Sequence, residues 1–139
     1  MIAILSIKTK YVEKILKVEK KYEFRKNSFR KDLDEVFVYA TKPIGEIVCK
    51  FYVGDIIVDK PKELWKNFKE FSGLTDDEFF TYFQGREKGV AIEIREVEKF
   101  TNPIDPKDLF PKFIPPQSWI YVSPDEFPHN SSYSGSKND

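Results

Sequence analysis

One short segment, Lys20–Lys26, combines the side-chain types that bind or transform a polar anion. Alternate side chains of a strand point to opposite faces, so Lys21, Glu23 and Arg25 share one face and two aromatic rings occupy the other. An acid between two bases supplies donors and an acceptor at fixed spacing, as a site for an anionic ligand requires. A strand face exposed to solvent has the same pattern, so both interpretations remain open.

A catalytic role for Lys20, the first residue of this segment, depends on the pKa of its ammonium group. A lysine acts as a base or nucleophile only when burial or nearby positive charge lowers its pKa. Lys21 and Arg25 would lower that pKa, and Glu23 would oppose them by stabilising the ammonium form. The alternative is a surface Arg25–Glu23 ion pair, which contributes about 0–1 kcal/mol to stability. Our working hypothesis is a binding cleft, with a solvated face and a catalytic group as the alternatives.

Charge is unevenly distributed along a chain that is neutral overall. The first 31 residues carry ten Lys or Arg and three Glu, and the remainder carries 13 basic and 20 acidic residues. Neutrality argues against indiscriminate coating of nucleic acid, while the segregation allows a local basic face. Phosphates need cationic donors, and unpaired bases stack on planar rings. The predicted nucleic-acid-binding residues are therefore Lys8, Lys10, Lys20, Lys21, Arg25, Lys26, Tyr39 and Trp119.

The elements that position these residues follow from the spacing of apolar side chains. Helical spacing predicts a helix over 10–17, another from Pro61 to Gly73, and a third from the Thr75–Glu78 capping box to Gly85. A short helical turn is expected over 105–110. Strands are predicted over 1–7, 21–26, 35–40, 90–97 and 117–122, with one or two long strands over 44–58 that bend at Gly54-Asp55.

These elements predict an α+β domain: a curled mixed or antiparallel β-barrel of five or six strands with flanking helices. Its 139 residues, 40% hydrophobic and 33% charged, suit one domain over 1–123, and the polar composition of 124–139 predicts a disordered tail. Cys49 is the only cysteine, which favours a reducing, cytoplasmic location. No apolar run approaches the ~18 residues that span a bilayer, so no membrane partner is expected. No metal-ligand or nucleotide motif appears, so no cofactor is expected.

Several segments resemble the ASCH family of the PUA-like superfamily. They are Ile4–Ile7 with the following Lys8-x-Lys10-Tyr11, then 19–25, Val38–Pro43, Gly54-Asp55 and Pro115–Ser118, within residues 2–122. The resemblance implies a small curled barrel with a cleft beside the first helix and second strand, and a role in binding RNA or modified nucleotides. Some relatives resemble nucleases, or amidohydrolases acting on N4-acylated cytidine nucleosides.

The amidohydrolase motif resembles G-x-K-T-x-T-x-R, with a catalytic lysine assisted by the second threonine. Lys20 and Arg25 match its lysine and arginine, Val18 stands in place of the glycine, and Lys21 and Glu23 replace the threonines. If the protein is an enzyme, the resemblance implies that Lys20 and Glu23 are catalytic.

Two functions are therefore predicted. The first is a module that holds RNA, another single-stranded nucleic acid or a modified nucleotide in a basic cleft. The alternative is an enzyme, either the amidohydrolase or a ribonuclease. A basic face that meets an acidic protein partner is a third possibility, and the oligomeric state is left open.

Overall fold

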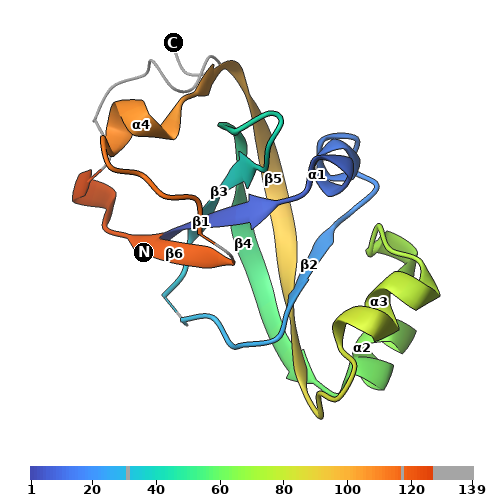
Figure 1. Ribbon diagram of the computed structural model, residues 1–139. Coiled ribbons are helices and arrows are strands. Elements are labelled where there is room, and N and C mark those ends of the chain that lie inside the picture. Colours follow the sequence, from blue (N-terminus) through green and yellow to red (C-terminus); the bar gives the residue numbers. More distant parts are fainter. Residues whose placement is uncertain (31, 117, 127–139) are drawn as a thin grey trace.

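A single curled sheet organises the molecule (Figure 1), in a computed structural model that describes residues 1–30, 32–116 and 118–126. Its six strands lie in the order β2-β5-β4-β3-β1-β6. Strands β1 and β3 are parallel, and the other neighbours are antiparallel. The predicted α+β curled mixed sheet is confirmed. The strands are β1 (Ile2–Ile7), β2 (Tyr22–Arg25), β3 (Glu35–Ala40), β4 (Glu46–Asp59), β5 (Gly89–Ile104) and β6 (Trp119–Val122).

Helices flank the two ends of the long antiparallel strands β4 and β5 (Figure 1). Within the described residues, no helix is long and apolar enough to cross a membrane. Residues 124–126 form a 3-10 turn, and the rest of the predicted disordered tail lies outside the described residues. The helices are α1 (Thr9–Leu16), α2 (Pro61–Phe68), the 3-10 turn η1 (Lys69–Phe71), α3 (Asp76–Tyr82), α4 (Pro106–Leu109) and the 3-10 turn η2 (Pro124–Glu126).

The antiparallel pair of β4 and β5 is irregular, and β5 is longer than its sequence indicates. Its register shifts between Val53 and Ile56, which fits the predicted bend at Gly54-Asp55. Strand β5 continues past the predicted end at Val97 as far as Ile104. Glu96 adopts a left-handed conformation with φ 49°, at the point where the register with β4 shifts between Lys50 and Tyr52. Such a residue interrupts the alternation without ending the pairing with the neighbouring strand.

Helix α1 ends in a motif that sets the path of the chain into β2. The Val18 N–H donates to the Ile15 carbonyl and the Glu19 N–H to the Lys14 carbonyl, the two bonds of a Schellman motif. Val18 occupies its left-handed position with φ 61°, which disfavours a β-branched residue by about 1–2 kcal/mol. Val18 also stands where the resembling motif has glycine, and in this chain that position is a helix end with a positive φ.

Three apolar clusters among the described residues hold the elements together. The largest lies between the curled sheet and α1 and includes Val12, Ile15 and Phe51. A second, around Phe37 and Phe100, receives the segment of α4 and includes Tyr39. The third joins α2 and α3 to β2 and β5; its buried members are Phe24, Leu64, Trp65, Phe79, Phe83 and Ala91.

Candidate functional site

The two edges of the open sheet meet at Arg25, the last residue of the edge strand β2. One terminal guanidinium nitrogen donates to Ser118 Oγ at 2.9 Å, and the other donates to the Ser6 carbonyl at 3.1 Å. Ser118 directly precedes β6, the opposite edge, and Ser6 lies on the neighbouring strand β1. The buried guanidinium therefore joins the two edges of the half-barrel across its interior.

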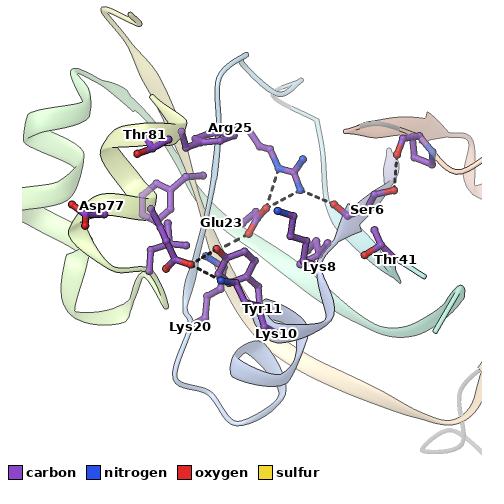
Figure 2. Close-up of a pocket in the computed structure, with 16 residues that line it drawn as sticks. Ser6, Lys8, Lys10, Tyr11, Lys20, Glu23, Arg25, Thr41, Asp77 and Thr81 are labelled. Atoms are coloured by element: carbon purple, nitrogen blue, oxygen red, sulfur yellow. Dashed lines mark hydrogen bonds and ion pairs between the residues drawn. The ribbon is translucent and has the colours of Figure 1, made fainter. Parts of the chain in front are cut away.

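Glu23 lies two residues before Arg25, on the same face of β2, and joins two buried cations (Figure 2). Its Oε2 accepts from Arg25 Nε at 3.0 Å, and its Oε1 lies 3.5 Å from Lys20 Nζ. Lys20, Glu23 and Arg25 are only 2%, 7% and 8% exposed. The interpretation of this strand face as solvated is therefore wrong: the charges form a buried network.

Three consecutive carbonyls, at the end of η1 and in the turn that leads to α3, accept hydrogen bonds from lysines of α1 and of the segment before β2. Lys20 Nζ donates to the Ser72 carbonyl at 2.7 Å, and Lys14 Nζ to the Gly73 carbonyl at 3.0 Å. The backbone N–H of Lys21 donates to the carbonyl of Phe71 at 2.7 Å. Gly73 has φ 72°, and a Cβ there would lie 3.0 Å from the Lys20 side chain. Glycine at this position thus lets the Lys20 stem pack against the turn.

Burial is the main cause that lowers the pKa of the Lys20 ammonium. The carboxylate of Glu23 opposes this shift, while the positive charges of Arg25 and Lys14 add to it. Burial, the opposing effect of Glu23 and the contribution of Arg25 agree with the expectation from the sequence, and Lys14 is a contributor that the sequence did not indicate. A lysine in this position gives up its proton more readily than one in water.

The buried network faces a cavity of about 810 Å³ between β1, α1, β2 and α3. Figure 2 shows Ser6, Lys8 and Thr41 on one side of the network and Asp77 and Thr81 on the helix α3 at the other. Four basic and three acidic side chains line it, so the cavity is only mildly positive. These side chains are those of Lys8, Lys10, Lys20, Arg25, Glu23, Asp77 and Glu78.

Glu78 connects α3 to α1 at this cavity. Its Oε1 accepts the Thr75 N–H at 2.9 Å, which completes the predicted capping box. Its Oε2 accepts from Tyr11 Oη at 2.9 Å and from Lys10 Nζ. These bonds, the one from Lys10 foremost, lower the pKa of the Glu78 carboxyl to about 2. The first turn of α3 therefore fixes one wall of the cavity.

The structure brings five of the predicted site residues together. Lys8, Lys10, Lys20, Glu23 and Arg25 all line the cavity. Lys8 and Lys10 are exposed, whereas the other three are buried beneath them. The Lys8 ammonium has no ion pair within the described part of the chain, so a ligand can reach it.

The other four predicted residues do not line the cavity. Lys21 Nζ lies over the ring of Phe71, 4.4 Å from its centroid. The side chain of Lys26 lies beside the cavity, 4.9 Å above the ring of Tyr82, which is part of the lining.

Neither predicted aromatic residue is available for stacking in the cavity. Tyr39 is 3% exposed, within the second cluster, so no base can reach its ring. The ring of Trp119 is partly buried and packs on Phe29, with 4.6 Å between ring centroids. Apolar packing, rather than ligand contact, accounts for both positions.

Residues that were not predicted complete the cavity. Tyr11 and Tyr82 supply its aromatic surface, Ser6 and Thr41 supply hydroxyls, and Glu78 supplies the bond between helices. The capping box was the one available signal for Glu78, but it predicts a helix start rather than a contact with α1. Across the described ranges, no group of three or more His, Cys, Asp or Glu side chains is placed to hold a metal ion.

Comparison with known proteins gives consistent matches. Residues 2–114 match a family described as a domain of unknown function (DUF365). An ASCH domain-containing ribonuclease of Zymomonas mobilis is 26% identical over 131 residues, 89% of this chain and 86% of that protein. The crystal structure of ASCH from Zymomonas mobilis has a TM-score of 0.83 at 26% identity, covering 90% of both chains. The N-terminal domain of Staphylothermus marinus McrB shares the fold alone, with a TM-score of 0.56 at 11% identity and 90% of both chains covered.

Proposed function

Because the chain belongs to the DUF365 family and carries an ASCH domain, we propose that it binds single-stranded RNA through the cavity above Lys20, Glu23 and Arg25. The observation that carries this proposal is the convergence of these three buried charges on one cavity. Its volume, about 810 Å³, lies within the range of small-molecule and cofactor sites. An unpaired nucleotide, unlike a duplex, can enter a hollow of this kind.

The mouth and the floor of the cavity suit different parts of a nucleotide. Lys8 and Lys10 are exposed cations that suit phosphate oxygens. The buried network and the hydroxyls of Ser6 and Thr41 offer fixed polar groups to a sugar or base edge. The mild net charge of the lining fits selective uptake of one nucleotide better than general adhesion to polyanions.

A matched pair of buried lysines provides the test of binding. Lys20→Met removes the ammonium while keeping an unbranched apolar stem one atom shorter, and we expect about tenfold weaker binding of a labelled single-stranded RNA in fluorescence anisotropy. The control is Lys50→Met, because Lys50 is also buried and ion-paired, with Glu35 at 3.3 Å, and does not line the cavity. Unchanged affinity in Lys20→Met, or an equal loss in both variants, would contradict the proposal.

Cleavage of the bound RNA is the second candidate function. The lowered pKa of Lys20 favours it, and so does the relative named a ribonuclease. Attack of a 2′-hydroxyl on the adjacent phosphorus needs a base for the hydroxyl proton, a proton for the departing 5′-oxygen and a cation near the phosphate. Lys20 would take the proton of the 2′-hydroxyl, solvent water would protonate the departing 5′-oxygen, and Lys8 would face the phosphate. The products are a 2′,3′-cyclic phosphate and a 5′-hydroxyl.

Product analysis separates this candidate from binding alone. We expect cleavage of a single-stranded RNA to stop when the reacting 2′-hydroxyl is replaced by hydrogen, and to be lost in Lys20→Met but kept in Lys50→Met. Intact RNA after incubation with the unmodified protein would reject cleavage and leave binding as the only proposed function. The same protein is incubated with N4-acetylcytidine, since release of acetate would favour the amidohydrolase alternative instead.

A further inference from the structure

A second hollow lies on the opposite side of α3 from the cavity. It measures about 510 Å³ and is formed where β4 passes into α2 and where the end of α3 returns to β5. Four basic side chains and one acidic side chain line it. We call it the α2–α3 groove, and its principal residues are Lys60, Lys62, Phe80, Arg86 and Lys88.

The cations of this groove are available to a ligand. Lys60, Lys62 and Lys88 are all exposed, and none of their ammonium groups forms an ion pair in the described ranges. Exposed cations without partners gain more from an incoming phosphate than cations that are already paired, because no existing bond is lost. The groove therefore complements an anionic chain.

An aromatic ring lies among these cations. Phe80, within α3, is 43% exposed. Edge-to-face contacts fix its orientation: its centroid lies 5.1 Å from that of Phe79 and 6.1 Å from that of Trp65. A ring that is exposed yet fixed in place offers a flat surface on which a base can stack.

The groove and the cavity share α3 as a wall and are connected around its end. Tyr82 lines the cavity and Phe80 lines the groove. Arg86 lines the groove, and its terminal nitrogen donates to the carbonyl of Lys26, beside the cavity, at 2.9 Å. The Lys26 ammonium in turn lies 4.9 Å above the Tyr82 ring. Lys26 and Arg86 thus form a basic connection from Arg25 in the cavity to the groove.

We propose that the α2–α3 groove is a second contact surface for the RNA strand that enters the cavity. Lys60, Lys62 and Lys88 contact its phosphates, and one of its bases stacks on Phe80. The identity of the ligand rests on the proposed function of the cavity. The groove adds that the protein recognises a stretch of several unpaired nucleotides rather than a single nucleotide.

RNA length provides the decisive measurement. We compare a ribodinucleotide, which is confined to the cavity, with a single-stranded RNA of about twelve nucleotides. Replacing Lys60, Lys62 and Lys88 together by glutamate should weaken the longer RNA about tenfold and leave the dinucleotide unchanged. Loss of three phosphate contacts should also reduce the slope of log affinity against log salt by about 2. A variant with glutamate at the exposed residues Lys99, Lys107 and Lys112 is the control for net charge.

A second variant tests stacking without any change of charge. Phe80→Leu keeps an apolar side chain against Trp65 but removes the flat ring, and we expect about tenfold weaker binding of the longer RNA. Unchanged affinity for the longer RNA in the triple groove variant would overturn the groove proposal. So would equally strong, groove-dependent binding of polyglutamate, which carries charge but no bases.

The two proposals fail in different ways. If Lys20→Met lowers affinity for both RNAs while the groove variants bind normally, the cavity function stands and the groove proposal is overturned. If Lys20→Met has no effect while the groove variants weaken the longer RNA, the groove is an RNA surface and the cavity proposal is wrong.

Discussion

Two glutamate–arginine pairs, each two residues apart on a strand, differ in burial. Glu23 and Arg25 on β2 lie 2.8 Å apart with both side chains 10% exposed. Glu93 and Arg95 on β5 lie 2.9 Å apart with side chains 24% and 54% exposed. Exposed pairs contribute about 0–1 kcal/mol, while removing one partner of a buried pair costs about 3–5 kcal/mol because a charge is left without its counter-ion. Burial, rather than distance, therefore sets the importance of the Glu23 network.

The first prediction compares these two pairs. Glu23→Gln should lower the free energy of unfolding by about 3 kcal/mol, because Lys20 and Arg25 would both remain buried without a counter-ion. Glu93→Gln should lower it by about 1 kcal/mol or less. Urea denaturation of both variants measures the difference. An equal loss would mean that water screens Glu23 as well, and would remove the argument for a buried site.

At the scale of elements, the position of α3 against α1 depends on one carboxylate. Glu78 accepts hydrogen bonds from Lys10 and Tyr11 on α1 and from the backbone N–H of Thr75. Its pKa falls to about 2 in the folded protein, from an ordinary value of 4.5. Because the folded pKa is the lower one, the stabilisation is fully present above the unfolded value and is lost as pH falls from 4.5 through 2.

The second prediction follows from the lowered pKa of Glu78 in the folded protein. Glu78→Gln should lower stability by about 1–2 kcal/mol at pH 7, since the charged acceptor is lost. The difference from the unmodified protein should shrink as pH falls below 4.5, because protonation removes the same charge from the native side chain. Thermal unfolding from pH 7 to 2 measures it, with Asp76→Asn at the exposed start of α3 as the control. A difference independent of pH would contradict the role of the Glu78 charge.

The elements around this contact were largely predictable, and the contact itself was not. The Thr75–Glu78 capping box and the alternation over β2 depend on neighbours along the chain, so the sequence contains them. The bond from Tyr11 to Glu78 joins residues 67 positions apart, and no local pattern indicates it. Burial of Lys20 escaped prediction for the same reason: a charged run suggests a surface, and only the curl of the sheet places it inside.

At the scale of the whole molecule, both ends of the described chain build the cavity. The family match stops at residue 114, yet β6 pairs with β1 along the sheet edge. The segment just before β6 lines the cavity through Pro116 and binds Arg25 through Ser118. The strand β6 also fixes the loop after β2, through Trp119 against Phe29 and through Tyr121 Oη, which accepts the Arg30 N–H at 3.0 Å. The C-terminal strand thus keeps Arg25 in position from two sides.

The last prediction distinguishes this structural role of Trp119 from the stacking role that its sequence suggested. Trp119→Ala should lower the free energy of unfolding by about 3 kcal/mol, because the contact with Phe29 and with the main core is lost. RNA affinity, measured by anisotropy at a temperature where the variant is fully folded, should change by less than about twofold. Ile120→Ala is the control, since Ile120 on the same strand is 38% exposed and should cost about 1 kcal/mol or less. A stable Trp119→Ala variant with about tenfold weaker RNA binding would instead assign the ring to the ligand.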